Sequence, residues 1–369
     1  MITTTGADAG YPMRRWYFED ARDRYELDLG DSYVECGRLG DLSLPADLVL
    51  NYGNNRGEDR LRALVADGYG RDADEVGITH GAQEALYLLY RALLRPGDHV
   101  VAFTPGWQQA WDVPAAAGCR VDLVGTTSEG RPDVAAAAEL IGPDTRAVVL
   151  NSPCNPTGRR AAADDTELLL AVLRRHGCYL VLDEEYVADL RGDSLLGRYE
   201  RAVSVSSVSK VYGFPGLRTG WMCGPADVVT AAMEHKHATT LSNSVLTSWL
   251  AADVLEKRAD YLDRYRRLTR TGSAVLRSWA ARHEDAVRLL EPEGTPFAWL
   301  SLPDRCGPLG AETSLSFCRR VLDRARVLLM PAEVFGAERG LRISVACEET
   351  VLREGLERIS ALLGQGDAR

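Results

Sequence analysis

Lys210 stands near the end of a run of serines and β-branched residues within the segment 204–221, SVSSVSKVYGFPGLRTGW. A turn rich in glycine and proline follows it, and Arg218 lies eight residues further along the chain. A lysine at the end of a buried strand is removed from water, and this favours the neutral amine that forms a Schiff base with a carbonyl group. The alternative is a lysine that reaches solvent beside an ordinary turn. Other residues of the chain are needed to distinguish a Schiff-base lysine from such a surface lysine.

A candidate anion site lies at Gly81, Ala82 and Gln83, between a strand-like run and a helix-like run. Backbone amides at the start of a helix, together with the helix dipole, attract a phosphate or a carboxylate. A plain helix start is the alternative for so short a motif.

Three further polar residues lie on or directly after strand-like runs. Asp183 ends CYLVLD, and a carboxylate on a core strand requires a partner, either a cationic ring nitrogen or a structural salt bridge. The loop 151–158, NSPCNPTG, is either plain turn chemistry or a rigid wall that presents Asn155. Arg342 lies in LRISVA, where an inward guanidinium requires a carboxylate.

The elements that have to position these residues alternate along the first two thirds of the chain. Strand-like, nearly continuous apolar runs occur at 76–79, 99–104, 120–124, 146–151, 178–183, 202–207 and 221–224. Helix-like runs occur at 13–25, 59–69, 82–94, 107–117, 133–141 and 162–176. Buried strands that alternate with helices predict a parallel sheet covered on both faces.

After about residue 228 the pattern changes to a mixture of helices and strands. Helix-like runs at 226–255 and 258–283 lead to a hairpin-like pair at 287–302, and further elements follow at 312–325, 326–330, 341–346 and 348–363. This mixture predicts a smaller α+β domain. The predicted division is 1–45 for an N-terminal segment that packs with the small domain and the active site, 46–250 for the large domain, and 251–369 for the small domain.

The composition of the chain excludes several classes of protein. With 369 residues and 46% hydrophobic content the chain can bury a sizeable core, and with a formal charge of −10 its interspersed arginines form no basic face for nucleic acid. The eight cysteines form no CxxC pair and no metal-binding spacing, which predicts reduced thiols in a cytoplasmic protein. The N-terminus lacks the features of a signal peptide, and no apolar run is long enough to span a membrane.

The anion site, the rigid loop, the strand-end acid, the lysine and the last arginine, in this order, resemble the class I/II aminotransferase superfamily, whose members bind pyridoxal 5′-phosphate (PLP). The matching motifs run from about Tyr52 to Arg342. The resemblance implies a PLP-dependent enzyme of fold type I, with a three-layer α/β/α large domain, a mostly parallel sheet and a smaller α+β domain. It also implies a small-molecule amino-acid substrate and a homodimer, in which Tyr52 reaches the phosphate in the neighbouring subunit.

The same resemblance gives each candidate residue a role. It implies that Lys210 is the Schiff-base lysine and proton shuttle, and that Asp183 pairs with the pyridine nitrogen. Tyr186 and Asn155 are expected to bind the phenolic oxygen, and Trp107 to stack on the ring. The phosphate end of the cofactor is expected to be held by Gly81, Ala82, Gln83, Ser207 and Arg218, and the substrate by Arg342, Asn155 and Gly30.

Four segments, 28–42, 210–221, 238–252 and 278–294, resemble a narrower group, the capreomycidine synthases. This subgroup acts on hydroxylated arginine in the biosynthesis of guanidino antibiotics. The resemblance implies an external aldimine and a quinonoid, loss of a β-hydroxyl group and ring closure by the guanidine, with Lys210 as acid and base. Candidates for binding the guanidinium are five acids near the entrance: Glu19, Asp20, Asp31, Glu35 and Glu185.

Three departures from these patterns surround the expected substrate cavity. Tyr33 stands where the subgroup has a small glycine, residues 107–109 read WQQ in place of a small residue and a tyrosine, and Ala332 replaces the usual glycine. Two other reactions therefore stay open, namely ordinary amino transfer to a 2-oxo acid and oxidation or hydroxylation of arginine. A PLP-fold transcriptional regulator would need an N-terminal DNA-binding domain, and no basic recognition helix precedes Tyr52.

Overall fold

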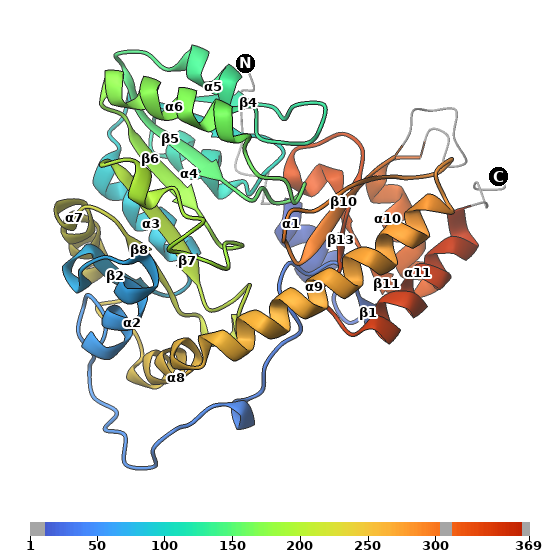
Figure 1. Ribbon diagram of the computed structural model, residues 1–369, viewed down its shortest axis with the longest axis horizontal. Coiled ribbons are helices and arrows are strands. Elements are labelled where there is room, and N and C mark those ends of the chain that lie inside the picture. Colours follow the sequence, from blue (N-terminus) through green and yellow to red (C-terminus); the bar gives the residue numbers. More distant parts are fainter. Residues whose placement is uncertain (1–11, 303–311, 364–369) are drawn as a thin grey trace.

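Seven strands form the largest sheet of the computed structural model, which describes residues 12–302 and 312–363 (Figure 1). Their order across the sheet is β2-β8-β7-β6-β5-β3-β4, and of these strands only β8 runs opposite to the rest. The strands are β2 (Val76–Thr79), β3 (His99–Phe103), β4 (Arg120–Val124), β5 (Thr145–Asn151), β6 (Tyr179–Asp183), β7 (Ala202–Ser207) and β8 (Gly220–Cys223). The predicted α/β fold with a mostly parallel sheet is confirmed.

Helices cover both faces of this sheet (Figure 1). One face is covered by α3 (Ala82–Leu93), α4 (Gln109–Ala116) and α7 (Ala226–His237), and the other by α2 (Asp59–Tyr69), α5 (Val134–Leu140), α6 (Ala163–His176) and α8 (Val245–Glu256). Alternate residues of a strand enter the two cores, so that Val100 of β3 faces the first set of helices and Val101 the second. Burial on both faces explains why these strands read as nearly continuous apolar runs.

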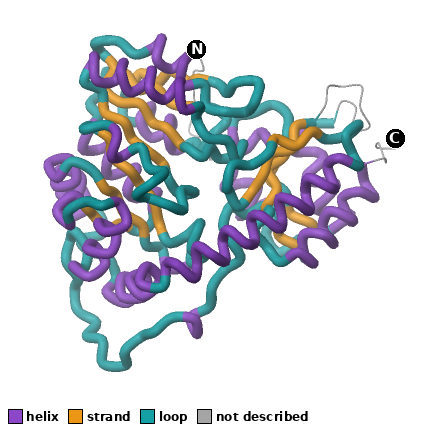
Figure 2. Tube along the Cα trace, in the orientation of Figure 1, coloured by secondary structure: helices purple, strands orange, loops and turns teal. Residues whose placement is uncertain are grey.

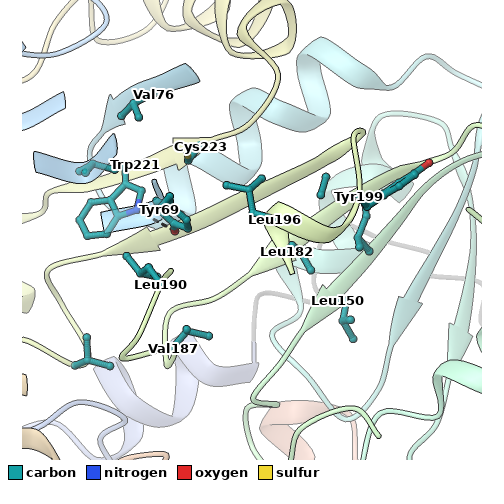
Figure 3. Packing of buried hydrophobic residues seen from close by; sticks show 14 of the residues in the cluster. Tyr69, Val76, Leu150, Leu182, Val187, Leu190, Leu196, Tyr199, Trp221 and Cys223 are labelled. Carbon is teal, nitrogen blue, oxygen red and sulfur yellow. Dashed lines mark hydrogen bonds between the residues drawn. The ribbon is translucent and has the colours of Figure 1, made fainter. Parts of the chain in front are cut away.

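A chain of polar groups crosses the core beside the large sheet, and Figure 3 shows two of its members, Trp221 and Tyr69. Trp221 Nε1 donates to the Tyr69 hydroxyl at 3.3 Å, and that hydroxyl lies 2.9 Å from Ser204 Oγ. Ser204 and Ser194 both donate to Glu184 Oε2, at 2.5 and 2.7 Å. These bonds satisfy the buried acid and hold the turn after β6 against β7, where the candidate site begins.

A four-stranded antiparallel sheet forms the smaller part of the molecule, in the order β12-β13-β10-β9. Its strands are β9 (Arg288–Leu290), β10 (Phe297–Ser301), β12 (Met330–Pro331) and β13 (Leu341–Ser344), and the helices of this part are α9 (Arg258–Ala281), α10 (Ser314–Ala325) and α11 (Glu349–Leu363). The N-terminal segment joins this part, because Trp16 is buried in its core and β1 (Leu27–Asp28) pairs with β11 (Val327–Leu328).

The long helix α9 runs from one part of the molecule to the other (Figure 2). Tyr265 and Leu268 in its first half belong to the core of the large sheet, whereas Leu276 and Trp279 in its second half belong to the core of the smaller part. One rigid element therefore contributes to both cores. The domain limits at residues 45 and 250 stay a prediction.

Two predicted helices differ from those observed. The run 226–255 contains α7 and α8 with a break between them, because residues 238–244, ATTLSNS, are mostly short polar and β-branched residues that favour turns and caps over helix interiors. Ser244 caps α8 by accepting a hydrogen bond from the backbone of Thr247. The run 13–25 forms α1 (Pro12–Arg14) and a π-helix at Arg15–Asp20, and it ends there. Within the described residues, no helix is long and apolar enough to cross a membrane.

Candidate active site

One pocket at the carboxyl edge of the large sheet is lined by most of the predicted site residues. Asp183 ends β6, Ser207 ends the neighbouring parallel strand β7, and Lys210 follows three residues later, so the strand ends bring these side chains together. The lining includes Ser32, Ala82, Gln83, Trp107, Asn155, Asp183, Glu185, Tyr186, Ser207, Lys210 and Arg218. The predicted residues Gly30 and Arg342 join this set through hydrogen bonds, and Tyr52 lies elsewhere.

Lys210 lies beneath a segment from the N-terminal region of the chain. Its Nζ donates to Ser32 Oγ at 3.1 Å and lies 5.6 Å from the centre of the Tyr33 ring, and its backbone oxygen accepts from the Val34 N–H. Burial lowers the pKa of the Lys210 amine, and the charges of Glu185 and Asp31 oppose this shift. The amine is thus easier to deprotonate than an exposed lysine, as a nucleophile or proton acceptor requires.

Asp183 is a partly buried acid that forms no ion pair with a basic residue of the described chain. Its Oδ1 accepts a hydrogen bond of 3.3 Å from the Glu185 N–H, and Asn151 Nδ2 donates to its backbone oxygen at 2.9 Å. Burial raises the pKa of Asp183 to about 7, and the charge of Glu185 acts in the same direction. A cationic ring nitrogen placed against this carboxylate would return the pKa to its ordinary range.

The start of α3 and Arg218 form the opposite end of the pocket. Gly81 has a φ of 80°, a conformation that favours glycine, and a Cβ atom at this position would lie 2.4 Å from Arg218 Nη2, so that the arginine side chain would have to move. Arg218 itself has a φ of 50°, a conformation that costs energy for a residue with a side chain, and its Nη1 donates to the Pro215 oxygen at 3.0 Å. The N–H groups of α3, the guanidinium and Ser207 thus offer donors to an anion.

Arg342 is 4% exposed and joins the two parts of the site. Its Nη1 donates to Asn155 Oδ1 at 2.7 Å and its Nη2 to the Gly30 oxygen at 2.6 Å, while its Nε is buried without a hydrogen-bond partner in the described chain. Phe297 and Phe335 flank the guanidinium, whose carbon lies 5.2 and 4.9 Å from their ring centres. No carboxylate of the described residues forms an ion pair with Arg342, so its charge is available to a bound acid.

The five entrance acids have different surroundings. Three of them form ion pairs, namely Glu19 with Arg14, Asp20 with Arg319 and Glu35 with Arg264. Asp31 forms none with the described residues, and its Oδ2 accepts from the Tyr17 hydroxyl at 2.9 Å. Glu185 differs from these four, because it is buried and lines the pocket.

Asp28 is an acid beside Asp31 that the sequence pattern did not single out. Its Oδ1 accepts from the backbone N–H groups of Gly30 and Asp31, at 2.8 and 3.1 Å. Burial raises the pKa of Asp28 to about 7, and the charge of Asp31 adds to the shift.

Ser32 is a second residue of the site that the sequence pattern did not single out. The signal that could have found both Asp28 and Ser32 is the density of polar residues in the segment 28–33, DLGDSY.

Tyr52 lies outside the pocket of its own chain. It is 83% exposed and belongs to an extended loop that leaves the body of the molecule, at the bottom of Figure 1. Other apolar side chains of the same loop are exposed as well, among them Leu39, Val49 and Leu50. The end of the loop is held in place where Lys236 Nζ donates to the backbone oxygen of Asn55 at 3.0 Å.

The chain matches the family model for aminotransferase class I and II over residues 44–359. It belongs to this family. Capreomycidine synthase from Streptomyces vinaceus is 32% identical to it, over 96% of this chain and 93% of the relative. Arginine–pyruvate transaminase from Pseudomonas aeruginosa is also 32% identical, over 85% of this chain and 84% of the relative. A crystal structure of a PLP-dependent cyclase in complex with a ligand superposes with a TM-score of 0.87 at 30% identity, and the match covers 98% of this chain and 99% of that one.

The chain is therefore a PLP-dependent enzyme of the aminotransferase family, and the predicted family, fold and cofactor are confirmed. The residues of the pocket fit PLP at both ends of the cofactor. A partly buried acid without a cation, Asp183, could hold the pyridine nitrogen, and donors from α3, Ser207 and Arg218 could hold the phosphate. Trp107 lines the space between these ends and could cover the ring.

Proposed function

We propose that this enzyme acts on an L-amino acid with a cationic, arginine-like side chain, and that its reaction is the elimination and cyclisation of a hydroxylated arginine. The observation that supports the substrate class is the pair Asp28 and Asp31. Both acids lack an ion pair with the described residues. The pair lies next to Gly30, which accepts from Arg342, and next to Ser32, which accepts from Lys210.

A cation at this pair is favourable for electrostatic reasons. Two carboxylates close together disfavour each other's ionised form, and the pKa of Asp28, raised to about 7, reflects burial and this repulsion. A planar guanidinium carries five N–H donors and binds carboxylates in pairs of hydrogen bonds. An amino acid whose α-carboxylate binds Arg342 would extend its side chain past Gly30 towards these acids. The pair therefore favours arginine over aspartate or an apolar amino acid.

The residues of the site have complementary roles in the proposed reaction. PLP, when bound through Lys210, supplies the electron sink that makes the Cα proton acidic. Lys210, whose amine is free once the substrate amine has taken its place on PLP, would take the Cα proton. The C–O bond at Cβ would break and the hydroxyl would leave as water, a guanidine nitrogen would bond to Cβ and lose a proton, and Cα would be protonated again. The balance is one hydroxyarginine to one cyclic guanidine and one water, so neither an oxidant nor a 2-oxo acid is consumed.

Amino transfer from arginine is the second candidate, because one relative of similar identity is an arginine–pyruvate transaminase. The acid pair would serve this reaction equally well. The difference lies in the fate of the electrons, since amino transfer needs a 2-oxo acid as second substrate and gives a 2-oxo acid as product. Aspartate aminotransferases also match the chain, at 29% identity for the one from Streptomyces avermitilis, and they support amino transfer as the alternative.

The two reactions can be separated by incubating the purified enzyme with L-arginine, 3-hydroxyarginine and common amino acids, each with and without 2-oxoglutarate or pyruvate. We expect 3-hydroxyarginine to give a product lighter by one water in the absence of any 2-oxo acid, and Lys210→Ala to give none. A 2-oxo acid formed from ordinary amino acids, with no cyclic guanidine, would contradict the cyclisation. Equal turnover of arginine and of uncharged amino acids would contradict the substrate class as well.

We further propose a homodimer in which Tyr52 completes the phosphate site of the partner subunit. Tyr52 is 83% exposed, and Val49 and Leu50 of the same loop are 76% and 73% exposed. A loop with several exposed apolar side chains is typical of an interface that is covered in the assembled protein.

The seven described cysteines are all free thiols, which supports a cytoplasmic enzyme.

A further inference from the structure

Glu185 was a candidate for the guanidinium, but the proposed function assigns that role to Asp28 and Asp31 and leaves Glu185 without one, although its side chain lines the pocket. It is 7% exposed and lies on the turn after β6. Its Oε2 accepts a hydrogen bond of 2.9 Å from Ser207 Oγ, and its Oε1 is buried without a hydrogen-bond partner in the described chain. A buried carboxylate oxygen without a donor is unfavourable unless another group comes to bind it.

Ser207 cannot serve both this carboxylate and a bound anion. A hydroxyl group has one proton to donate, and the Ser209 N–H, at 3.0 Å, already occupies an acceptor position on Ser207 Oγ. If a phosphate accepts the hydrogen bond of this hydroxyl, Glu185 Oε2 loses its donor, and both carboxylate oxygens are then buried without one. An ionised Glu185 would then also repel the phosphate.

The charged groups around Glu185 lead to the same conclusion. Four titratable groups face it from the elements packed around it: Asp183 and Tyr186 from its own turn, Lys210 after β7, and Arg218 before β8. Burial raises the pKa of Glu185, while the charge of Lys210, the hydrogen bond from Ser207 and the charge of Arg218 lower it. An anion bound to Ser207 and Arg218 would cancel two of these three influences, and the ionised carboxylate would lose most of its support.

We propose that Glu185 is a further residue of the phosphate site, where it takes up one proton from solvent as the phosphate binds and then donates a hydrogen bond to it. The carboxylate, the anion and one proton combine, and no other bond forms or breaks. This proposal rests on the assignment of Ser207 and Arg218 to the phosphate and is independent of the identity of the amino-acid substrate.

The test uses the full-length chain freed of PLP, with sulfate as the probe, because sulfate is a dianion that takes up no proton near neutral pH. Calorimetric titrations in two buffers of different ionisation enthalpy give the number of protons taken up per sulfate between pH 6.5 and 9. We expect close to one proton at pH values where Glu185 is ionised in the free chain, and an affinity that falls about tenfold for each pH unit above that point.

Three variants decide whether the proton binds to Glu185. In Glu185→Gln, an isosteric change, we expect little proton uptake and an affinity that hardly depends on pH. In Lys210→Ala we expect the uptake of one proton to persist, because the other group that could take the proton is removed. Its pH dependence should move to higher pH, since the charge of Lys210 lowers the pKa of Glu185. In Arg218→Ala we expect at least tenfold weaker sulfate binding, since the guanidinium is part of the site.

Several results would overturn the proposal. Proton uptake that persists in Glu185→Gln, or that is absent from the wild-type chain over the whole pH range, would refute the role of Glu185. Sulfate binding that does not respond to Arg218→Ala would refute the assignment of the anion site and the proposal with it. If Glu185→Gln does not fold, as judged by circular dichroism, Ser207→Ala takes its place. Because this change removes the hydrogen bond that favours ionised Glu185, it should move the pH dependence of sulfate binding to higher pH, and an unmoved pH dependence would contradict the proposal.

Discussion

Replacing Asp31 with asparagine is expected to weaken arginine binding far more than the binding of an uncharged amino acid. Asp31 Oδ2 accepts a hydrogen bond of 2.9 Å from the Tyr17 hydroxyl, and an asparagine amide has the same size and keeps an oxygen acceptor. The substitution therefore removes a charge with little change of shape. Asp28 keeps the second carboxylate of the pair.

The magnitude follows from the cost of losing one charged hydrogen-bond partner. A hydrogen bond to a charged group contributes about 1.5–3 kcal/mol, and about 1.4 kcal/mol corresponds to a factor of ten in affinity. The loss of arginine affinity that corresponds to 1.5–3 kcal/mol is roughly 10- to 150-fold. Because Asp28 leaves one negative charge beside the guanidinium, we expect the lower part of this range, about 10- to 40-fold.

The assay is a spectroscopic titration of the PLP-loaded enzyme with L-arginine and with L-norleucine, whose side chain is apolar. The expected result is a raised dissociation constant for arginine and a change of less than about twofold for norleucine. Asp20→Asn is the matched control, because Asp20 already pairs with Arg319 at 3.0 Å. Equal losses for both ligands, or no loss for arginine, would refute the reasoning.

The same pair predicts a pH dependence. The pKa of Asp28 is raised to about 7 by burial and then by the charge of Asp31, so Asp28 takes up a proton as the pH falls through this value. Arginine affinity of the wild-type enzyme should therefore decrease below about pH 7. In Asp31→Asn the repulsion is absent, the pKa of Asp28 falls towards its ordinary range, and this decrease should move to lower pH.

Two further predictions concern the cofactor site. The pKa of Asp183 is about 7 in the folded chain, against an ordinary value of 3.8. Between about pH 4 and pH 7 the unfolded chain therefore loses this proton while the folded chain keeps it, and the free energy of unfolding falls as the pH rises through this range. In the chain without PLP, Asp183→Asn should raise the melting temperature at pH 8 and leave it nearly unchanged at pH 4. The same variant should bind PLP at least tenfold more weakly. Equal changes of the melting temperature at both pH values would contradict this reasoning. An equal mixture of Tyr52→Ala and Lys210→Ala chains should regain about a quarter of the wild-type activity. Half of the dimers are then mixed, and one of the two sites in each mixed dimer is intact. No gain of activity over the separate variants would contradict a shared site.

The large sheet and its neighbouring helices could be predicted because their signals are local. Strands buried on both faces read as apolar runs, and β5 at Thr145–Asn151 differs from the predicted run 146–151 by one residue. The ends of such parallel strands fix where polar residues meet, which is why Asp183 and Ser207 could be placed together from the sequence. The break between α7 and α8 was not predicted, because the apolar residues on both sides indicate helix while the turn-favouring residues 238–244 form only a short interruption.

The N-terminal side of the site could not be predicted to the same extent. The hydrogen bond between Lys210 and Ser32 joins residues 178 positions apart, and that between Arg342 and Gly30 joins residues 312 positions apart. Such contacts depend on how the two parts of the molecule pack, and neither periodicity nor composition reports on this packing. The polar residues of 28–33 marked this segment in the sequence, but only the structure places Asp28 and Ser32 at the site.

The charges that lack partners in the described chain agree with the proposed cofactor site and substrate class. Arg342 lacks a carboxylate, Asp183 lacks a cation, and the pair Asp28 and Asp31 lacks one as well. A charge that is removed from water without a partner destabilises the fold, and this cost is largest for Arg342, which is buried, and smaller for the three partly buried acids. PLP with a protonated ring nitrogen would neutralise Asp183, and an amino acid with both an α-carboxylate and a guanidinium would neutralise Arg342 and the acid pair. An aspartate substrate would instead bring a third carboxylate to the two already present, and this repulsion argues against the reaction of the aspartate aminotransferases more directly than the sequence comparisons do.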